Sequence, residues 1–534
     1  MNVSRAKRTQ NLAHPTDSTS SNSIKEISAR TSNDLIIGLC GTIGSGLHAL
    51  RTSIESRLSL HNYVVRHVHI SKLMKEFFPS DYSTFEKDIE SDSYNRYKGL
   101  QDLGNALREK YNSHILAEAA ITKISFYRER DKRLESPAPD RVAYIVDQLK
   151  HPSELELFRL IYQHNFYLFG VIRTESERKR NLRDEGIPAK HIDELFHRDR
   201  KFDDPNGQQT EKTIRDADFF IKNNQSHVAE LDKKIGRYVD LIHGVNGITP
   251  TMDEKGMFSA YSASMQSACL SRQVGAAILD EDGNMIVTGR NDVPKFGGGL
   301  YSSEDGEQDY RCIHKGAKCY NDFHKDKMRK KIFSITKKFF GEQNGIYKPE
   351  DLEVLKKYTN KEHLEKLVDN IYNESPINAL IEYSRAIHAE MDAITSLARL
   401  HGANSKNKII YTTTYPCHNC ARHIVAAGIQ KAIYIEPYEK SLALDLHDDA
   451  ICDANSKSPN KVIFEQFEGV SPRRYTTLFL SRTDRKSDNG SVIKVSVRYG
   501  THADNQFKDS FIDYEAKVFE NFSKKVQLVP ANEQ

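Results

Sequence analysis

A glycine-rich stretch near the start of the chain constrains its fold more than any other feature. Residues 35–50 read LIIGLCGTIGSGLHAL, an apolar run followed by glycines and then by helical spacing. This is the layout of a loop that holds phosphate groups between a buried strand and a helix N-terminus. The candidate phosphate-binding residues are Gly41, Gly44, Ser45 and Gly46. Such a loop normally continues with Lys and then Ser or Thr, but Leu47 and His48 stand at these positions.

Strand-like and helix-like segments alternate behind this loop. Apolar runs of strand length occur at residues 62–70, 141–149 and 165–173, with amphipathic stretches among them. This alternation predicts a parallel sheet that binds ligands at the carboxyl ends of its strands. Asp147 directly follows a buried strand, a position suited to a carboxylate on the magnesium side of a nucleotide site.

The first part of the chain resembles nucleoside-monophosphate kinases in its glycine-rich loop, its Asp147 strand and the arginine-rich segment RTESERKRNLRDEG. The resemblance implies a P-loop kinase-like domain over residues 33–245 with a degenerate nucleotide site. Without the lysine and the hydroxyl, the site lacks the cation that follows the phosphoryl group and a ligand for Mg²⁺. Two interpretations remain, a module that senses a nucleotide or partner and a relic that serves only as a platform.

Composition limits the classes of function. Lys plus Arg number 77 against 74 Asp plus Glu, so no global positive field draws the chain to nucleic acid. The longest apolar run is the glycine-containing one above, which is unsuited to span a membrane. Seven sparse cysteines favour a reducing compartment, and we expect the protein in the cytoplasm. Residues 1–32 lack the apolar core of a secretory signal and are expected to be a disordered tail.

Two short motifs in the second half of the chain carry the chemistry. IHAEMDAI contains His388 and Glu390, and TYPCHNCARHI contains Cys417 and Cys420. His-x-Glu followed by Pro-Cys-x-x-Cys is the signature of zinc-dependent nucleobase deaminases. One imidazole and two thiolates supply three zinc ligands and leave the fourth tetrahedral position open, as in catalytic rather than structural sites. Zn²⁺ is therefore the expected cofactor, with His388, Cys417 and Cys420 as its ligands.

Glu390 is the candidate catalytic residue, because a carboxylate beside the metal can accept a proton from water and pass it to the base. A Cys-x-x-Cys alone is also compatible with a redox pair or half of a zinc ribbon, but no second such pair exists to complete a ribbon. Both motifs read as helix starts, with Pro416 in the first turn of the second helix.

Residues 257–438 resemble the deoxycytidylate deaminase family in SRQVGAAILDEDGNMIVTGRNDVP and in the two motifs above. The resemblance implies an α/β/α sandwich over residues 250–485, with a C-terminal extension at 486–534. It also implies that Asn291 contacts the deoxyribose or phosphate and that Arg272 lies near the phosphates. Arg290 and Asp292 replace an aromatic residue and a glycine common in the family, which leaves the preferred phosphate number and allosteric control open.

An insertion at residues 301–378 and a later arginine pair each allow two interpretations. The insertion carries four potential ligands of a second zinc, namely Cys312, His314, Cys319 and His324. Their spacing matches no standard finger, so ordinary side chains are the alternative. Arg473 and Arg474 either meet phosphates or form a solvated surface.

The order of the two domains resembles bacterial anti-phage deoxycytidylate deaminases. The resemblance implies deamination of dCTP and dCMP, which drains the pool that a replicating phage needs. It also implies activity restrained until infection, in some members by a small RNA, and we add a nucleotide effector and a homo-oligomer as expected partners. The alternatives are a housekeeping enzyme that supplies dUMP for thymidylate synthesis and a polynucleotide cytosine or adenosine deaminase. Against the last, the charge balance is near neutral and the chain has no Trp.

Overall fold

The computed structural model of this 534-residue protein describes most of the chain between residues 32 and 526. The gaps fall at 135–138, 140, 201–205, 224–227, 342–359, 376, 378–379, 402–403, 439–440, 455–457, 459, 481–484 and 496–507. Residues 1–31 of the expected tail and 527–534 of the expected C-terminal extension lie outside the described residues. In the described part, no helix is long and apolar enough to cross a membrane.

The first of two sheets has the strand order β12-β5-β4-β1-β3-β2, and every neighbouring pair is parallel except β12 with β5. Its strands are β1 (Leu35–Gly41), β2 (Val64–His69), β3 (Val142–Asp147), β4 (Phe166–Ile172), β5 (Phe219–Lys222) and β12 (Gly469–Val470). The three apolar runs noted in the sequence thus contain β2, β3 and β4. The predicted parallel sheet is confirmed for β1 to β5.

Helices cover both faces of this sheet, because successive side chains of each strand point to opposite faces. Leu35, Ile37 and Leu39 of β1 contribute to a core with α2 and α11, whereas Ile36 and Cys40 contribute to a core with α6, α7 and α20. We call this sheet and its helices the first body, and the second sheet described below with its helices the second body. The helices of the first body are α2 (Leu47–Ser59), α3 (Ile70–Phe77), α4 (Pro79–Ile89), α5 (Ser93–Lys110), α6 (Ile115–Leu134), α7 (Pro152–Tyr162), α8 (Glu175–Asp184), α9 (Ala189–Arg200), α10 (Thr210–Arg215), α11 (Val228–Ile242) and α20 (Lys508–Val526).

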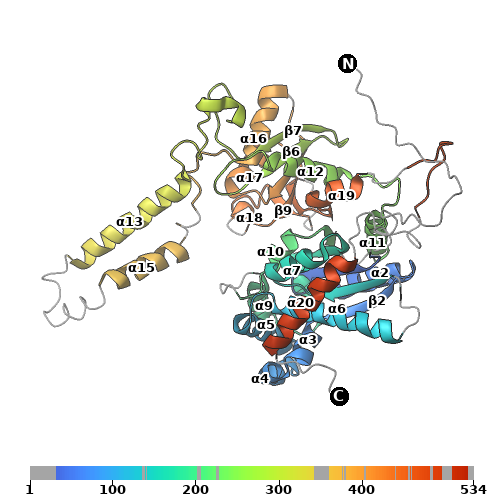
Figure 1. The fold of residues 1–534 in the computed structure, drawn as a ribbon. Coiled ribbons are helices and arrows are strands. Elements are labelled where there is room, and N and C mark those ends of the chain that lie inside the picture. The colour runs from blue at the N-terminus through green and yellow to red at the C-terminus, as the bar shows by residue number, and fades with distance from the viewer. Residues whose placement is uncertain are drawn as a thin grey trace, which may run out of the picture.

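The C-terminal helix α20 returns to the first body and packs along α6 (Figure 1). Arg128 of α6 pairs with both Asp34 and Glu515, and all three side chains are buried. Phe522 makes edge contacts with Phe77. The buried carboxylate of Glu515 on α20 therefore meets the positive charge of Arg128 only when α20 packs on α6.

The second sheet has the order β10-β11-β9-β8-β6-β7. β10, β11, β9 and β8 run parallel, while β6 pairs antiparallel with both β8 and β7. Its strands are β6 (Gly275–Leu279), β7 (Met285–Arg290), β8 (Ile409–Thr414), β9 (Lys431–Glu436), β10 (Ile451–Asp453) and β11 (Val462–Gln466). The chain is thus a mixed α/β protein with two sheets in which parallel pairing predominates.

Small residues let helices approach this second sheet closely. One face carries α12, and the other carries α16 and α17. A Cβ on Gly275 would lie 1.9 Å from the carbonyl oxygen of Ala260 in α12, and one on Gly289 would lie 2.4 Å from the backbone of α16. The helices of this body are α12 (Met252–Ser264), α13 (Tyr320–Gly341), α15 (Lys361–Glu374), α16 (Ala389–Ser396), α17 (His418–Ala426), α18 (Ala443–Leu446) and α19 (Tyr475–Phe479).

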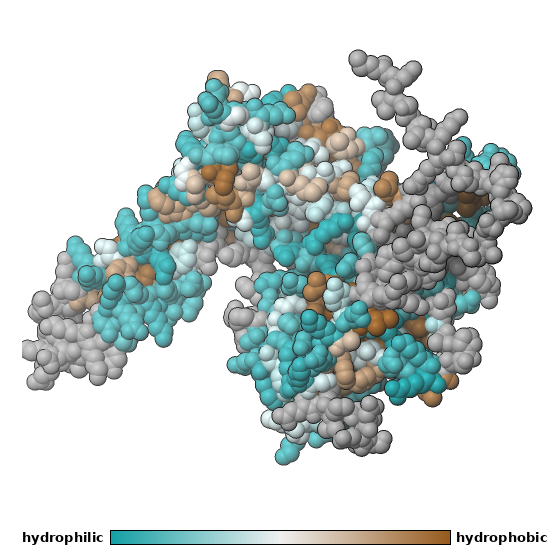
Figure 2. All heavy atoms as spheres, viewed as in Figure 1, coloured by the Kyte–Doolittle hydropathy of each residue, from teal (hydrophilic) through white to brown (hydrophobic). Residues whose placement is uncertain are grey.

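Two helices of the insertion, α13 and α15, form an arm that projects away from both sheets (Figure 1). The surface of this arm is largely hydrophilic (Figure 2). Arg329 of α13 pairs with Asp369 of α15. The segment of α13 that is rich in Lys and Arg therefore presents a solvated face.

The two bodies are joined by more than a linker. Glu254, at the start of α12, is buried and accepts hydrogen bonds from Arg237 of α11 and from the backbone N–H of Val470. Phe220 of β5 makes an edge contact with Phe467 at a centroid distance of 5.8 Å. The domain boundaries expected from the sequence stay a prediction, but residues 469–470 belong to the first sheet.

The contact between Gly289 and α16 generates a prediction about stability. Replacement of Gly289 by Ala should force α16 away from β7 and lower the stability by about 1–3 kcal/mol through overpacking. Differential scanning calorimetry would register this as a lower melting temperature. Gly104→Ala is the matched control, because a Cβ there meets its neighbours only at 3.5 Å or more and Ala favours the helix α5. Equal melting temperatures of the two variants would contradict the prediction.

Candidate functional site: a His–Cys–Cys cluster beside a pocket

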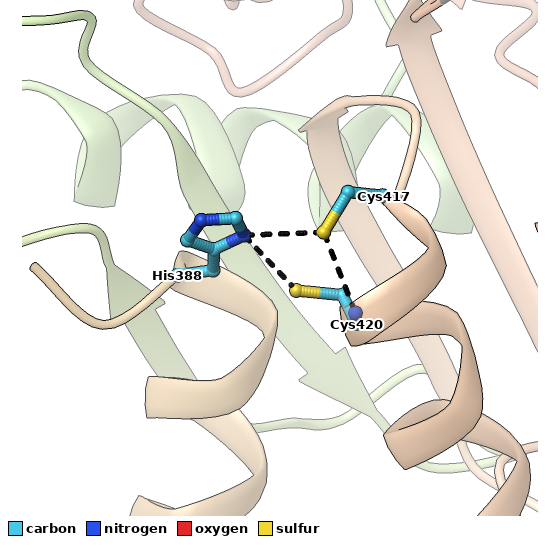
Figure 3. A group of neighbouring side chains, drawn as sticks. All are labelled: His388, Cys417 and Cys420. Carbon is cyan, nitrogen blue, oxygen red and sulfur yellow. Dashed lines mark hydrogen bonds between the residues drawn. The ribbon is translucent and has the colours of Figure 1, made fainter. Parts of the chain in front are cut away.

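Two helix N-termini bring three potential metal ligands together on one face of the second sheet (Figure 3). His388 is the N-cap residue of α16, and Cys417 is the N-cap residue of α17. The His388 Nδ1 atom lies 3.4 Å from Cys417 Sγ and 3.3 Å from Cys420 Sγ. Both motifs therefore begin helices as expected, although Pro416 precedes the N-cap of α17 and does not lie in the first turn.

The three side chains suit a zinc ion. Their donor atoms all lie within 4.8 Å of one another, and among the described residues this is the group of His, Cys, Asp and Glu side chains close enough to hold a metal. One nitrogen and two sulfurs are donors that zinc prefers, and the set leaves one tetrahedral position open. The open position distinguishes this cluster from a closed structural site.

The electrostatics of the cluster favour a thiolate. The pKa of Cys417 is lowered to about 4, mainly because its sulfur accepts a hydrogen bond from the Cys420 thiol and also because it lies beside His388. The pKa of His388 is raised to about 9, mainly because the imidazole forms a hydrogen bond with Cys417. The N-terminus of α17 adds a positive potential at Cys417. A cation in the cluster would replace the protons that the side chains share.

Glu390 lies in the first turn of α16 and points at the cluster. Its side chain is buried, and its Oε2 lies 3.4 Å from Cys420 Sγ. Burial raises the pKa of the Glu390 carboxyl. A carboxyl whose pKa is raised in this way can hold a proton nearer to neutral pH than an exposed one can, which suits a group that moves protons.

A pocket opens directly beside the cluster, and most residues expected at the site line it. His388, Glu390, Cys417, Arg272 and Asn291 all contribute to its wall. Arg272 is about half exposed, and its Nη2 lies 3.4 Å from Glu436 Oε1. The amide of Asn291 is occupied, because its Oδ1 accepts from Val274 N–H and its Nδ2 donates to the Arg272 carbonyl, both at 2.7 Å.

Asn291 thus holds the loop that carries Arg272, and its contact with a sugar or phosphate stays a prediction. Other pocket residues were not found from the sequence. They include Tyr320, Arg385, Tyr415 and Tyr438, whose only sequence signal was nearness to a motif or to the insertion. Asp292 was noted only as a departure from a family pattern, yet its backbone forms a bridge with Ile387 that positions the adjacent His388.

The structure does not bring the four expected ligands of a second zinc together. Cys312 and Cys319 line the pocket. His314 instead faces Asp309 at 3.3 Å, and His324 stacks on Tyr383 at 5.2 Å. A closed zinc site needs all four donors around one point, so the ordinary-side-chain interpretation fits the described residues better.

The other sequence candidates lie in or against the first sheet. Oδ2 of Asp147 pairs with Arg51 Nη1 at 3.0 Å and with His69 Nδ1 at 2.6 Å, and a role of this carboxylate toward magnesium stays a prediction. Arg473 pairs with Asp216, and Arg474 pairs with Asp218. The two side chains join the second body to acidic residues of the first. Arg473 is also exposed, which agrees with the interpretation as solvated surface, and a contact with phosphates stays a prediction.

Comparison with known proteins identifies the second body. Residues 250–436 match the family model of the cytidine and deoxycytidylate deaminase zinc-binding region. These residues form a zinc-binding deaminase domain. The chain is thus a hydrolytic deaminase whose cofactor is zinc, and the matched range includes His388, Glu390, Cys417 and Cys420.

Individual relatives match the same part of the chain. A deoxycytidylate deaminase of Enterobacteria phage T4 is 29% identical over 182 residues, which cover 34% of this chain and 76% of the phage protein. ComE operon protein 2 of Bacillus subtilis (strain 168) is 41% identical over 56 residues, 10% of this chain and 29% of that protein. A dCMP deaminase structure from cyanophage S-TIM5, in complex with dCMP and dUMP, shares 16% identity with a TM-score of 0.22 and covers 41% of this chain and all of its own.

The ligand set of the deaminase domain can be tested by metal analysis. Cys417→Ala removes one of three donors, so we expect the purified protein to lose most of its zinc. Inductively coupled plasma mass spectrometry measures the zinc content of each protein. Cys269→Ala is the control, because Cys269 lines the same pocket but lies outside the cluster. A zinc content of the Cys417 variant equal to that of the Cys269 variant would remove Cys417 from the ligand set.

Proposed function

We propose that the deaminase domain converts dCMP and dCTP to the corresponding deoxyuridine nucleotides, and that the protein thereby depletes dCTP in a cell infected by phage. The observation that carries the reaction is the cluster of His388, Cys417 and Cys420 beside the buried Glu390 in one pocket. Deamination needs a nucleophile positioned at the carbon that bears the amino group and, beside it, a residue that moves protons.

The residues around the base have separate tasks. His388, Cys417 and Cys420 would hold the zinc ion. When bound, this ion acts as a Lewis acid and makes water nucleophilic near neutral pH. The Glu390 carboxylate takes a proton from the attacking water and delivers protons to the ring nitrogen and to the departing ammonia. Tyr415 and Tyr438 in the pocket wall offer apolar rings that exclude bulk water from the base.

The nucleotide end of the substrate is expected toward Arg272. Its guanidinium lines the pocket and is about half exposed, so it can meet a phosphate without a large desolvation cost. Glu436 accepts from Arg272 and also from Arg215 of the first body, each at 3.4 Å. The relatives from phages T4 and T2, both named deoxycytidylate deaminase, support a deoxycytidine nucleotide as the substrate.

Depletion of dCTP and phage defence rest on the resemblance of the whole chain to anti-phage deaminases. On this proposal, the enzyme acts in the cytoplasm as a homo-oligomer, and its activity is restrained allosterically until infection. The P-loop kinase-like body would carry that restraint, with a nucleotide effector or a small inhibitory RNA as the partner. A housekeeping dCMP deaminase would not need this body. A polynucleotide deaminase is less favoured, because the net charge of the chain is only +3.

The reaction is tested in vitro with purified protein and three substrates, namely dCMP, dCTP and a cytosine-containing DNA oligonucleotide. We expect ammonia release from at least one free nucleotide and none from the oligonucleotide. Glu390→Gln should retain zinc but lose about 100-fold or more of the activity, since it cannot move the protons. Glu281→Gln, the same change at an exposed turn, is the control and should remain fully active. An active Glu390→Gln protein would contradict the assigned role.

The cellular role has its own experiment. Nucleotide pools are measured by mass spectrometry in cells that express the intact chain or the Glu390→Gln variant, with and without phage. Defence predicts a fall in dCTP and a rise in deoxyuridine nucleotides upon infection, only with the intact chain. A fall that is equal with and without phage would favour the housekeeping alternative.

A further inference from the structure

The loop at residues 41–46 is held rigidly by side chains that occupy its carbonyl groups. Arg178 Nε donates to the Ile43 carbonyl at 2.9 Å, and Asn181 Nδ2 donates to the Gly44 carbonyl at 2.8 Å. Asn223 Nδ2 donates to the carbonyls of both Ser45 and Gly46 at 2.9 Å. A loop whose carbonyls are held in this way keeps one shape with or without a ligand.

The N-terminus of the helix that follows this loop has neither a side-chain cap nor an acidic residue in its first turn. α2 begins at Leu47, its N-cap residue Gly46 has φ 76°, no side chain caps it, and its first turn carries no acidic residue. The first backbone N–H groups of a helix have no acceptor within the helix and attract anions. By itself this feature is common and identifies no ligand.

Arg173 supplies the independent observation. It follows β4 directly, at the carboxyl end of a strand that pairs with β1. Its side chain is fully buried, and none of its three guanidinium nitrogens has a hydrogen-bond partner among the described residues. Glu177 lies 3.9 Å from Nε, beyond hydrogen-bond distance, and its Oε2 accepts from Thr174 Oγ1.

The unpartnered guanidinium faces the loop. Its Nη1 lies 3.2 Å from the position that a Cβ on Gly46 would take. The hydroxyl of Ser45 in the same loop is likewise buried, and it has no hydrogen-bond partner in the part of the chain that the structure describes. A buried charge without hydrogen bonds is costly, and burial lowers the pKa of Arg173 accordingly. The Arg173 guanidinium and the Ser45 hydroxyl are thus buried donors at one loop, and an anion bound there would satisfy them.

We propose that this loop binds the phosphate groups of a nucleotide, and that Arg173 provides the positive charge which the lysine of an ordinary phosphate-binding loop would provide from the position of Leu47. Arginine suits this place, because its planar fork can meet two phosphate oxygens at once. The site spans two neighbouring strands, with the loop after β1 and the guanidinium after β4.

The surroundings of the loop fit binding without phosphoryl transfer. Lys150 is occupied by Asp199 and by the Gly41 carbonyl. Asp147 is occupied by Arg51 and His69. His48 offers no hydroxyl to Mg²⁺. On this proposal, the loop binds phosphate groups without transferring a phosphoryl group.

The proposal is tested by isothermal titration calorimetry on the full zinc-loaded chain in buffer without added magnesium. The probes are ATP, inorganic tripolyphosphate and adenosine. We expect ATP to bind and adenosine not to bind. Tripolyphosphate binding as tight as that of ATP would assign recognition to the phosphate chain, and weaker binding would show that the nucleoside adds contacts. Absence of binding by both phosphate probes would overturn the proposal.

Variants locate the site. Arg173→Met removes the charge at similar length and should weaken ATP binding about tenfold or more. Arg173→Lys, which keeps a cation, should bind more tightly than Arg173→Met. Arg133→Gln removes an exposed arginine from α6 of the same body, and Arg272→Gln removes the cation of the deaminase pocket. Neither should change ATP binding, and loss of binding in Arg272→Gln would place the ligand in the deaminase pocket and refute the proposal.

Thermal stability separates a ligand-binding arginine from a structural one. Without a probe, the melting temperature of Arg173→Met should equal or exceed that of the parent, because the variant removes a buried charge that makes no hydrogen bond among the described residues. ATP should raise the melting temperature of the parent but not of the variant. A lower melting temperature of the variant without a probe would make Arg173 a structural residue and overturn the proposal.

Discussion

The close approach of two helix N-termini on one face of a sheet is the constraint on which the chemistry of this protein depends. His388 and Cys417 are both N-cap residues, so each donor is positioned by the first turn of its helix. The helices can approach because Gly289 leaves room for the backbone of α16. Their positive ends also favour the thiolate that a zinc ion requires. The metal site is therefore a consequence of how α16 and α17 pack on β6 to β9.

The deaminase domain and the first body form one packed unit. Glu254 joins α12 to both α11 and β12, and Arg474 reaches back to Asp218. Helix α20 packs on α6 and α7 of the first body and buries Glu515 against Arg128. Beside the pocket, Glu436 contacts one arginine from each body, namely Arg215 of α10 and the pocket residue Arg272.

Much of the fold followed from local patterns in the sequence. Strands β1, β3 and β4 lie in short apolar runs whose side chains are buried on both faces, and such runs can be recognised in a sequence because parallel sheets need them. The His-x-Glu and Pro-Cys-x-x-Cys motifs were equally legible, since zinc chemistry demands particular donors at particular spacings. Roles predicted from single residues were less reliable than roles predicted from motifs. Asp147 is engaged by Arg51 and His69, and the four candidate ligands in the insertion point to different partners.

By itself, then, the sequence determined which elements form and which side chains can hold zinc and carry protons. Only the tertiary structure decided that residues 469–470 and α20 complete the first body, and that Arg473 and Arg474 join the two bodies. It alone placed the buried guanidinium of Arg173, which has no hydrogen bond among the described residues, beside a loop more than a hundred residues earlier in the chain. The physical reason is that motifs record short-range geometry, whereas the partner of a buried charge is chosen by the packing of segments distant in sequence.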